Sequence, residues 1–367
     1  MKILFLTNHL NPGGITSYLL TVCRALRGAG DVRLFIASRG GTRQEAFQSL
    51  GVTLWHVPLT TKCEVSPKVF LSYLRLKPLV RRERIDLLHA QTRVTQVLAA
   101  GLSRAAGVPF LSTCHGYFKP RLSRRLFPCW GQKVIAVSDQ VRTHLLNDFG
   151  LLSGQIALVY NGVDVERFKP PTAQEKQAAC RALGLDPSKK TVGHIGRLSD
   201  VKGQKYLVEA AAKLAGARKD TQFLLVGDGK EEAALRRLVC EKRLEGVFHF
   251  QRSVDDTAVP LRAMDVFVMP SLQEGLGLSL LEAMASGVPC VASMVGGILS
   301  VVQDGASGLL VPPADPAALS RGIARLLDDS GLSATLAYQA RRQAEKKFAA
   351  SSMAHLTKEV YSSLCLD

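Results

Sequence analysis

Short apolar runs rich in β-branched and aromatic residues alternate with amphipathic segments through the first half of the chain. The runs have the composition of buried strands, and the segments between them, such as Thr16–Arg27 and Val94–Ala106, have helical periodicity. This alternation predicts a parallel sheet with helices on both faces. Its strands are expected at Lys2–Thr7, Val32–Ala37, Thr53–Val57, Leu87–His89, Phe110–Thr113 and Lys133–Val137.

A break in this alternation follows residue 160. The Asn161-Gly162 turn and the Pro170-Pro171 pair interrupt regular structure, and a helical pattern resumes at Ala173–Leu183. Beyond it the alternation restarts and predicts a second doubly wound sheet, followed by a helix-rich tail at 332–364. The strands of this second sheet are expected at Thr191–Ile195, Gln222–Val226, Val247–Gln251, Val266–Met269 and Pro289–Ala292, with helices at Gln204–Leu214 and Glu231–Glu241 among them.

The chain of 367 residues is long enough for two domains, each with its own hydrophobic core. The pattern predicts an N-terminal Rossmann-like domain at 1–168 and a C-terminal Rossmann-like domain at 169–345. A C-terminal helix at 346–367 is expected to pack back across the first domain. The first apolar run is too short for a signal peptide, and no stretch suits a membrane span, so a cytoplasmic protein is expected.

Positive charge is concentrated in the first half. Residues 1–169 contain 23 Lys and Arg against 9 Asp and Glu, a net charge of +14, whereas residues 170–367 carry +2. A basic domain is consistent with nucleic acid, an anionic membrane surface, an anionic substrate or simply a soluble cationic surface. We expect no nucleic acid, because the sequence has no binding motif with interleaved aromatic residues.

Two segments of the basic half interleave cations with large apolar residues. They span 69–84 and 117–130, and the second contains Arg121, Arg124 and Arg125. This pattern is typical of segments that lie at a membrane interface, and it predicts peripheral contact with an anionic membrane. Prolines interrupt both segments, so two ordinary helices with solvated basic faces are the alternative.

Loops that follow predicted strands carry residues suited to binding an anion. The Gly-rich turn Asn11–Thr16 lies between the first predicted strand and the first predicted helix, where backbone N–H groups and the helix dipole favour negative charge, although many such turns serve packing alone. The turn lacks the GxGxxG spacing of a dinucleotide site, which argues against an NAD enzyme. Arg197 and Lys202 follow a predicted strand and would together neutralise a diphosphate without a metal.

The segment 270–290 has the most specific spacing. Glu274 lies in the loop after a predicted strand, Gly275 and Gly277 open the next helix, and Glu282 lies about two turns inside it. Glycines at a helix start expose backbone N–H groups to a phosphate, while carboxylates accept hydrogen bonds from sugar hydroxyls. The spacing therefore predicts a site for a sugar linked to a phosphate.

With these motifs in this order, the chain resembles the retaining glycosyltransferases of the GT-B fold, and glycosyltransferase family 4 in particular. The resemblance covers nearly the whole chain and implies an α/β fold of two Rossmann-like, doubly wound domains that face a cleft. It also implies individual roles. Glu274 would lie near the transferred sugar and Glu282 on the nucleotide ribose. Arg197 and Lys202 would bind the pyrophosphate, and the backbone of Gly14 would face the donor phosphate.

The resemblance extends to further donor-site residues. Gly275, Gly277 and Leu278 match the donor-binding start of the family's helix, and His115 matches the histidine beside the donor sugar. The resemblance thus implies that His115, Glu274, Arg197 and Lys202 are the catalytic residues. A histidine at a strand end can also be purely structural.

One position departs from the family pattern. After Gly296-Gly297 the family usually has a Pro-Glu pair, whereas this chain has Ile298-Leu299-Ser300. Because that loop usually lies close to the donor, the change bears on donor preference.

The implied reaction is transfer of a hexosyl group, with retained anomeric configuration, from a UDP-, GDP- or ADP-sugar to a hydroxyl acceptor. A lipopolysaccharide core or another envelope glycan or glycolipid would be the acceptor. No cofactor or divalent metal is expected, and eight cysteines without CxxC spacing predict no zinc site. The alternatives are a nucleotide-sugar epimerase on the same fold and a catalytically silent basic protein that binds membrane or nucleic acid. The sequence leaves the base, sugar, acceptor, linkage and oligomeric state open.

Overall fold

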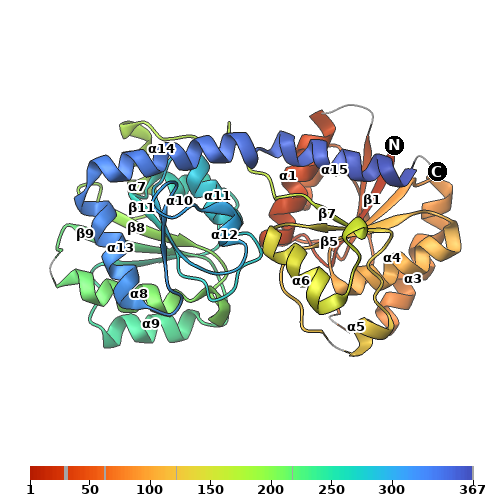
Figure 1. Cartoon of the computed structure of the whole chain (residues 1–367), viewed down its shortest axis with the longest axis horizontal. Coiled ribbons are helices and arrows are strands. Elements are labelled where there is room, and N and C mark those ends of the chain that lie inside the picture. Colours follow the sequence, from red (N-terminus) through yellow and green to blue (C-terminus); the bar gives the residue numbers. More distant parts are fainter. Residues whose placement is uncertain (29–31, 62, 121, 217, 366–367) are drawn as a thin grey trace. The chain divides into compact units, whose positions relative to one another are not determined.

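The computed structural model describes residues 1–28, 32–61, 63–120, 122–216 and 218–365 (Figure 1). Contacts divide the chain into two compact units: unit 1 comprises Met1–Gly162 and the C-terminal segment from Ala350 onward, and unit 2 comprises Val163–Ala349. The sequence pattern predicts these two domain boundaries a few residues away, at 168/169 and 345/346. In the structure the two crossings of the chain lie side by side, because Val163 pairs with Ala349 in an isolated bridge.

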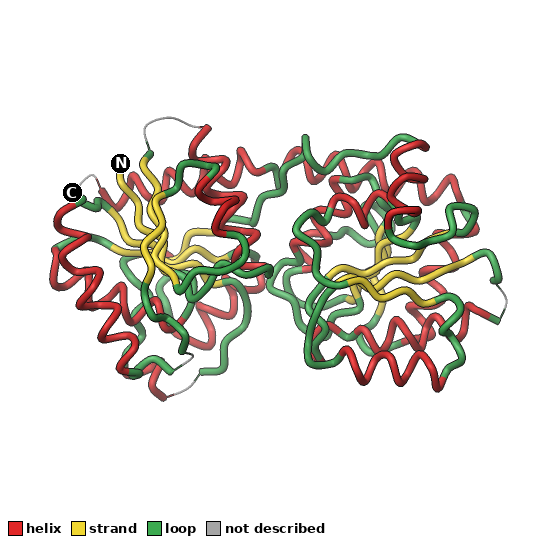
Figure 2. Tube along the Cα trace, turned by 180° about the vertical axis from the view of Figure 1, so that it is seen from behind, coloured by secondary structure: helices red, strands yellow, loops and turns green. Residues whose placement is uncertain are grey.

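Unit 1 contains a parallel sheet, whose strands are yellow in Figure 2. The strand order is β3-β2-β1-β4-β5-β6-β7. The central strands of this sheet are buried, as in β1, where Ile3 to Leu6 are fully buried. All six expected strands are present, and their ends differ from the expected ends by at most one residue. The sheet also contains a short seventh strand, which the sequence pattern did not predict. The strands are β1 (Lys2–Leu6), β2 (Arg33–Ser38), β3 (Thr53–His56), β4 (Leu87–Ala90), β5 (Phe110–Cys114), β6 (Lys133–Ala136) and β7 (Ile156–Leu158).

The helices of unit 1 begin and end at residues with clear local roles. Thr92 forms a capping box at the start of α4, and Gly107 adopts the left-handed conformation that ends it. Tyr361 of the C-terminal helix α15 is fully buried in this unit. The helices are α1 (Gly14–Gly28), α2 (Gln44–Gln48), α3 (Pro67–Arg82), α4 (Arg93–Ala106), α5 (Leu122–Leu126), α6 (Asp139–Phe149) and α15 (Ala350–Cys365), with a 3-10 turn at Ser153–Gln155.

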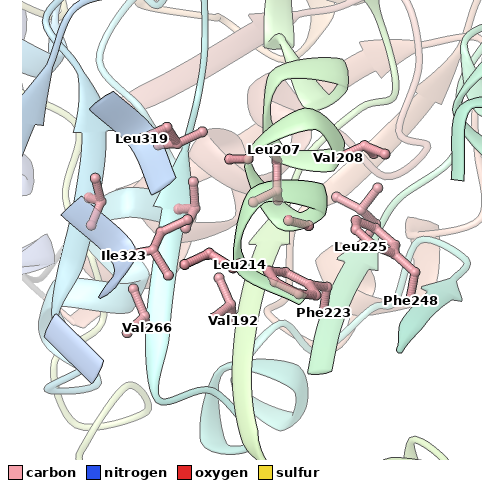
Figure 3. Packing of buried hydrophobic residues seen from close by; sticks show 14 of the residues in the cluster. Val192, Leu207, Val208, Leu214, Phe223, Leu225, Phe248, Val266, Leu319 and Ile323 are labelled. Carbon is pink, nitrogen blue, oxygen red and sulfur yellow. The ribbon is translucent and has the colours of Figure 1, made fainter. Parts of the chain in front are cut away.

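Unit 2 contains a second parallel sheet, in the order β10-β9-β8-β11-β12-β13. Its core packs Leu207, Val208 and Leu214 of one covering helix against strand residues such as Val192 and Phe223 (Figure 3). The strands are β8 (Lys190–Ile195), β9 (Thr221–Val226), β10 (Phe248–Gln251), β11 (Val266–Met269), β12 (Cys290–Ser293) and β13 (Leu309–Val311). The helices are α7 (Ala173–Ala182), α8 (Gln204–Ala215), α9 (Glu232–Glu241), α10 (Ala258–Arg262), α11 (Leu278–Ala285), α12 (Ile298–Val301), α13 (Pro316–Asp328) and α14 (Ser330–Lys347), with a 3-10 turn at Asp200–Lys202.

Among the described residues, no helix combines the length and the apolar character needed to cross a membrane.

Candidate active site

Both sheets reverse their strand order at one place, and the candidate residues gather at these two places. In unit 2 the reversal lies between the neighbouring strands β8 and β11, and in unit 1 it lies between β1 and β4. Open α/β sheets bind ligands outside the carboxyl ends of the strands at such a switch point. The loops after these strands are therefore the positions in each unit where a ligand is expected.

In unit 2 the loops after β8 and β11 are joined by their backbones. The N–H of Leu272 donates to the carbonyl of Val201 (2.8 Å). Gly203, whose φ is +65°, lies so close to the carbonyl of Pro270 that a Cβ atom would approach that oxygen to 2.0 Å. Only glycine fits this contact, so Gly203 allows the two loops to come together.

Lys202 and Glu274 form an ion pair across these two loops. Both side chains are largely buried, with 25% and 11% of their surface exposed. The Glu274 carboxylate also accepts a hydrogen bond from the Ser271 hydroxyl (3.4 Å). The structure thus brings together two residues that lie 72 positions apart in the sequence.

Arg197 lies on the same edge with an exposed side chain. Its backbone is held by Gln204, whose side-chain amide donates to the Arg197 carbonyl (2.8 Å). Among the described residues, the Arg197 guanidinium makes neither a hydrogen bond nor an ion pair. The site therefore contains one cationic side chain, Arg197, that is available to bind an anion, and a second, Lys202, that is paired with the Glu274 carboxylate.

The helix α11 begins at this edge. Gly277 precedes it with a φ of +95°, and the Ser279 hydroxyl donates to the Ile195 carbonyl at the end of β8 (2.8 Å). The first backbone N–H groups of a helix have no partner within the helix, and Leu278 contributes the first of them. This helix start faces the same switch point as the lysine and arginine, which suits a phosphate group.

Gly275 is buried beneath this helix start. Its carbonyl lies so near Gly297 that a Cβ atom on Gly297 would approach the oxygen to 1.9 Å, and the Gly297 N–H donates to the Glu274 carbonyl (2.9 Å). The segment that departs from the family pattern, which begins after Gly297, therefore packs directly on the Glu274 loop. In it, Ile298 is buried and Leu299 is 44% exposed, so an apolar side chain occupies a position beside the site.

Glu282 lies within α11, about one turn beyond Leu278. Its carboxylate accepts a hydrogen bond from the Thr257 hydroxyl (2.9 Å), just before α10. The structure therefore places Glu282 on the same helix as Gly277 and Leu278, but it holds the carboxylate against a different loop from the one that holds Glu274.

In unit 1, His115 follows β5 directly and is partly buried. Its Nε2 lies 2.8 Å from the side-chain oxygen of Gln91, and its ring stacks edge-on against Tyr18 with centroids 4.8 Å apart. Burial lowers the pKa of His115 to about 3, so the imidazole is neutral at physiological pH. With Nε2–H donating to Gln91, Nδ1 is left as a hydrogen-bond acceptor.

The sequence analysis did not single out Gln91, which follows β4 and is 1% exposed. Its side-chain nitrogen is buried and has no hydrogen-bond partner among the described residues. A buried donor without a partner is costly unless a ligand or water meets it. No local signal marks this glutamine; its position beside His115 depends on β4 lying next to β5.

Gly14 opens α1 after β1, at the switch point of unit 1. The chain enters this helix through Gly13, and the N–H of Ser17 donates to the Gly13 carbonyl (2.9 Å). The structure thus separates the predicted residues into two groups by unit: Gly14 and His115 in unit 1, and Arg197, Lys202, Glu274, Gly275, Gly277, Leu278 and Glu282 in unit 2.

Comparison with known proteins assigns the chain to a family. The model of Glycosyltransferase Family 4 matches residues 12–167, and the model of Glycosyl transferases group 1 matches residues 175–343. The lipopolysaccharide core biosynthesis mannosyltransferase LpsB of Rhizobium meliloti is 32% identical over 66% of this chain and 70% of its own length. The chain belongs to glycosyltransferase family 4.

Similarity to other known proteins extends over nearly the whole of this glycosyltransferase. The D-inositol 3-phosphate glycosyltransferase 2 of Catenulispora acidiphila is 28% identical over 98% of the chain and 94% of its own length. The crystal structure of Anabaena HepE in complex with UDP and glucose matches 99% of the chain and 100% of HepE with a TM-score of 0.88 and 24% identity. The expected GT-B fold and glycosyltransferase activity are confirmed, and the interpretation as a catalytically silent protein is set aside.

Proposed function

We propose that this glycosyltransferase transfers a hexosyl group from a UDP-, GDP- or ADP-sugar to a hydroxyl acceptor, with retention of the anomeric configuration and without a divalent metal. The observation that carries this proposal is the switch point of unit 2, where Arg197, Lys202 and the start of α11 meet. Two cationic side chains and unpartnered helix-start N–H groups are what a diphosphate requires when no metal bridges its oxygens.

In the proposed reaction, the bond between the anomeric carbon and the diphosphate oxygen breaks, and a bond to the acceptor oxygen forms on the same face. The negative charge that develops on the leaving diphosphate is stabilised by Arg197 and Lys202, which are already in place. The acceptor's proton passes to the departing phosphate oxygen, so no separate protein base is needed. The Glu274 carboxylate, released from Lys202, accepts hydrogen bonds from sugar hydroxyls.

Gly14 and His115 of unit 1 are assigned to the donor's phosphate and sugar on the strength of the family resemblance. Because its pKa is about 3, His115 would act as a neutral hydrogen-bonding group rather than as a cation. Glu282 is assigned to the nucleotide ribose.

For the acceptor we propose an envelope glycan or glycolipid, such as a lipopolysaccharide core, reached by a peripheral protein at the inner face of the cytoplasmic membrane. The name of the Rhizobium relative, a lipopolysaccharide core mannosyltransferase, supports this choice. The complex of HepE with UDP and glucose supports a nucleotide-sugar donor.

A thermal-shift screen of UDP-, GDP- and ADP-sugars tests donor binding. A ligand that binds only the folded state raises the melting temperature by mass action, so one base should give a clear increase. The Arg197→Ala variant serves as the control in which this increase should be lost. No shift with any of the three would refute the proposed donor class.

The identified donor then permits two tests of the chemistry. NMR of the product should show the donor's own anomeric configuration, and turnover should be unchanged in excess EDTA. An inverted product would refute retention. Activity lost in EDTA and restored by a divalent cation would refute the metal-free mechanism.

A further inference from the structure

The outward face of α3 in unit 1 is apolar where the face of a solvated helix would be polar. The helix contributes Val69, Leu76 and Val80 to the core of the unit. Its other large apolar side chains, Phe70, Leu71 and Leu74, are 61%, 50% and 49% exposed, and no described element covers them. A helix that is apolar on two sides has a second apolar surface to bury.

Two loops with exposed apolar side chains are held together near the start of α3. The Arg93 guanidinium forms an ion pair with Glu64 and donates to the carbonyls of Phe127 (2.6 Å) and Pro128 (2.8 Å). Val65, which follows Glu64, is 85% exposed, and Phe127 is 67% exposed. One guanidinium therefore holds the loop before α3 and the loop after α5 together, so the exposed residues Val65 and Phe127 both lie in loops held near the start of α3.

The electrostatics of the Glu64 carboxyl favour its ion pair with Arg93. Partial burial alone would raise its pKa, but hydrogen bonds from Arg93 and Ser123 and the nearby guanidinium charges outweigh burial and hold the pKa below its usual value. The carboxylate is thus ionised and neutralised by Arg93, and it does not offset the charge of α3.

The charge around this face is positive. Residues 65–82 contain no Asp or Glu and five cations, among which Lys68 and Arg75 are exposed beside the apolar side chains. Arg124, which the sequence pattern places at a membrane surface, is instead buried, with its guanidinium over the rings of Phe118 (4.3 Å) and Trp130 (5.2 Å). Arg121 lies outside the described residues, and the side chain of Arg125 is not described. The basic character of the surface therefore rests on α3.

We propose that the basic-apolar face, formed by Val65, Phe70, Leu71, Leu74 and Phe127 with Lys68 and Arg75, docks on an anionic lipid bilayer. Its apolar side chains would enter the headgroup region while the cations remain at the level of the phosphates. A second copy of the chain fits less well, because a two-fold dimer would place two basic faces against each other. The proposal extends the proposed glycolipid acceptor, and it is tested by binding rather than turnover so that either can fail alone.

Co-sedimentation of the full chain with vesicles tests the proposal. Binding should be strong with equimolar phosphatidylglycerol and phosphatidylcholine, weak with phosphatidylcholine alone, and reduced by salt, which shortens the screening length. The variant Lys68→Gln/Arg75→Gln should bind more weakly by about fivefold for each cation removed. The control Arg237→Gln/Arg252→Gln removes two exposed arginines of unit 2 and should bind like the parent chain.

The apolar contribution needs a variant that keeps the fold. Phe70→Ser/Leu71→Ser/Leu74→Ser should lose binding on the order of tenfold, because the side chains that enter the bilayer are gone. The control Leu152→Ser/Tyr338→Ser changes side chains that are equally exposed elsewhere, and it should retain binding. Melting temperatures check that each variant is folded.

Single tryptophan substitutions test whether α3 enters the bilayer without removing the apolar character of its exposed face. In Phe70→Trp, fluorescence should be quenched by vesicles that contain brominated lipid, whereas in Tyr338→Trp it should not. Equal binding to both vesicle types, binding to neither, or quenching that is the same at both positions would overturn the proposal. Concentration-dependent dimerisation that the α3 variants abolish would instead identify a second copy as the occupant and would also overturn it.

Discussion

Units 1 and 2 share one architecture, but they differ in where they place their charge. Unit 2 carries a net charge of only +3, yet it places Arg197, Lys202 and Glu274 together at its switch point. Unit 1 carries +13, yet beside its switch point it has a neutral histidine after β5, held by a glutamine after β4. Net charge therefore does not locate a binding site; the position of a few side chains at the carboxyl ends of strands does.

The difference extends to the outer surfaces. The excess cations of unit 1 lie on helices such as α3, beside exposed apolar side chains. In unit 2, exposed apolar side chains such as Met294 and Leu299 lie instead near the loop that packs on the Glu274 segment. The basic unit is thus suited to a surface and the near-neutral unit to a small anion.

The largest effect is expected from the cations of unit 2. Arg197→Ala and Lys202→Ala should each reduce kcat/KM for the donor by about 2–4 kcal/mol of transition-state stabilisation, because each removes a fixed group that faces developing charge. Arg237→Ala, which removes an exposed arginine of the same unit, is the matched control. Initial rates against donor concentration measure the effect. Near-normal kinetics in both site variants would contradict the assignment of the diphosphate to this edge.

A smaller effect should separate the two carboxylates of unit 2. Glu282→Ala should mainly raise KM for the donor, since a ribose contact is made equally before and during the reaction, while Glu274→Ala should mainly lower kcat. Each change should amount to about 1.5–3 kcal/mol, the range for hydrogen bonds to charged groups. The reverse pattern in steady-state kinetics would require the two roles to be exchanged.

In unit 1, turnover should depend on the hydrogen bond between Gln91 and the neutral His115. Gln91→Leu should lower kcat by about tenfold, as expected for the loss of a hydrogen bond of about 1 kcal/mol together with orientation of the ring. Gln91→Glu should restore the hydrogen bond and raise the pKa of His115, so its pH profile should shift toward neutrality. Were both variants to match the parent in rate and pH profile, Gln91 would have no part in positioning His115.

A further effect concerns stability rather than catalysis: the stability of the two units should depend differently on pH. Burial lowers the pKa of His89 and His115 in unit 1 from 6.5 to about 3, and that of His194 in unit 2 to about 4. Because the unfolded chain takes up these protons first, stability is complete above about pH 6.5 and falls as the pH drops toward the folded values. Each buried histidine contributes at most about 1.4 kcal/mol per pH unit.

Hydrogen exchange resolves this difference by unit. Between neutral pH and pH 4, protection in unit 1 should decrease more steeply than in unit 2, because unit 1 holds two of these three histidines. In His89→Gln the slope for unit 1 should become shallower. Equal slopes for both units in the parent chain would show that other groups dominate acid unfolding.

The hydrophobic pattern was sufficient for most strands but not for the shortest ones. Runs such as 266–269 and 191–195 are long and apolar enough to identify β11 and β8. The strands β7 and β13 have three residues each, which is too few to show a period. In α3 the prolines do not interrupt the helix: Pro67 lies in its first turn, where no N–H partner is needed, and Pro78 lies inside it.

Local spacing identified the candidate residues, but it could not pair them. Glu274 and Lys202 are recognisable in their own loops, whereas their ion pair depends on β8 lying beside β11. Gln91 has no local signal at all, and Arg124 reads as a surface cation until the rings around it are seen. Contacts of this kind follow from the order of strands in a sheet, which is a property of the whole fold.

The Lys202–Glu274 pair also bears on how the products leave. In the structure the lysine and the carboxylate neutralise each other, so neither is buried with an unmatched charge. In the proposed reaction, an intact sugar nucleotide would replace both partners at once, with its phosphate for the lysine and its hydroxyls for the glutamate. The nucleoside diphosphate that remains after transfer would replace only the carboxylate as the partner of Lys202, and it would leave Glu274 without a partner beside an anion. Re-forming the ion pair then favours release, so the site should hold the spent nucleotide less tightly than the donor and should resist product inhibition.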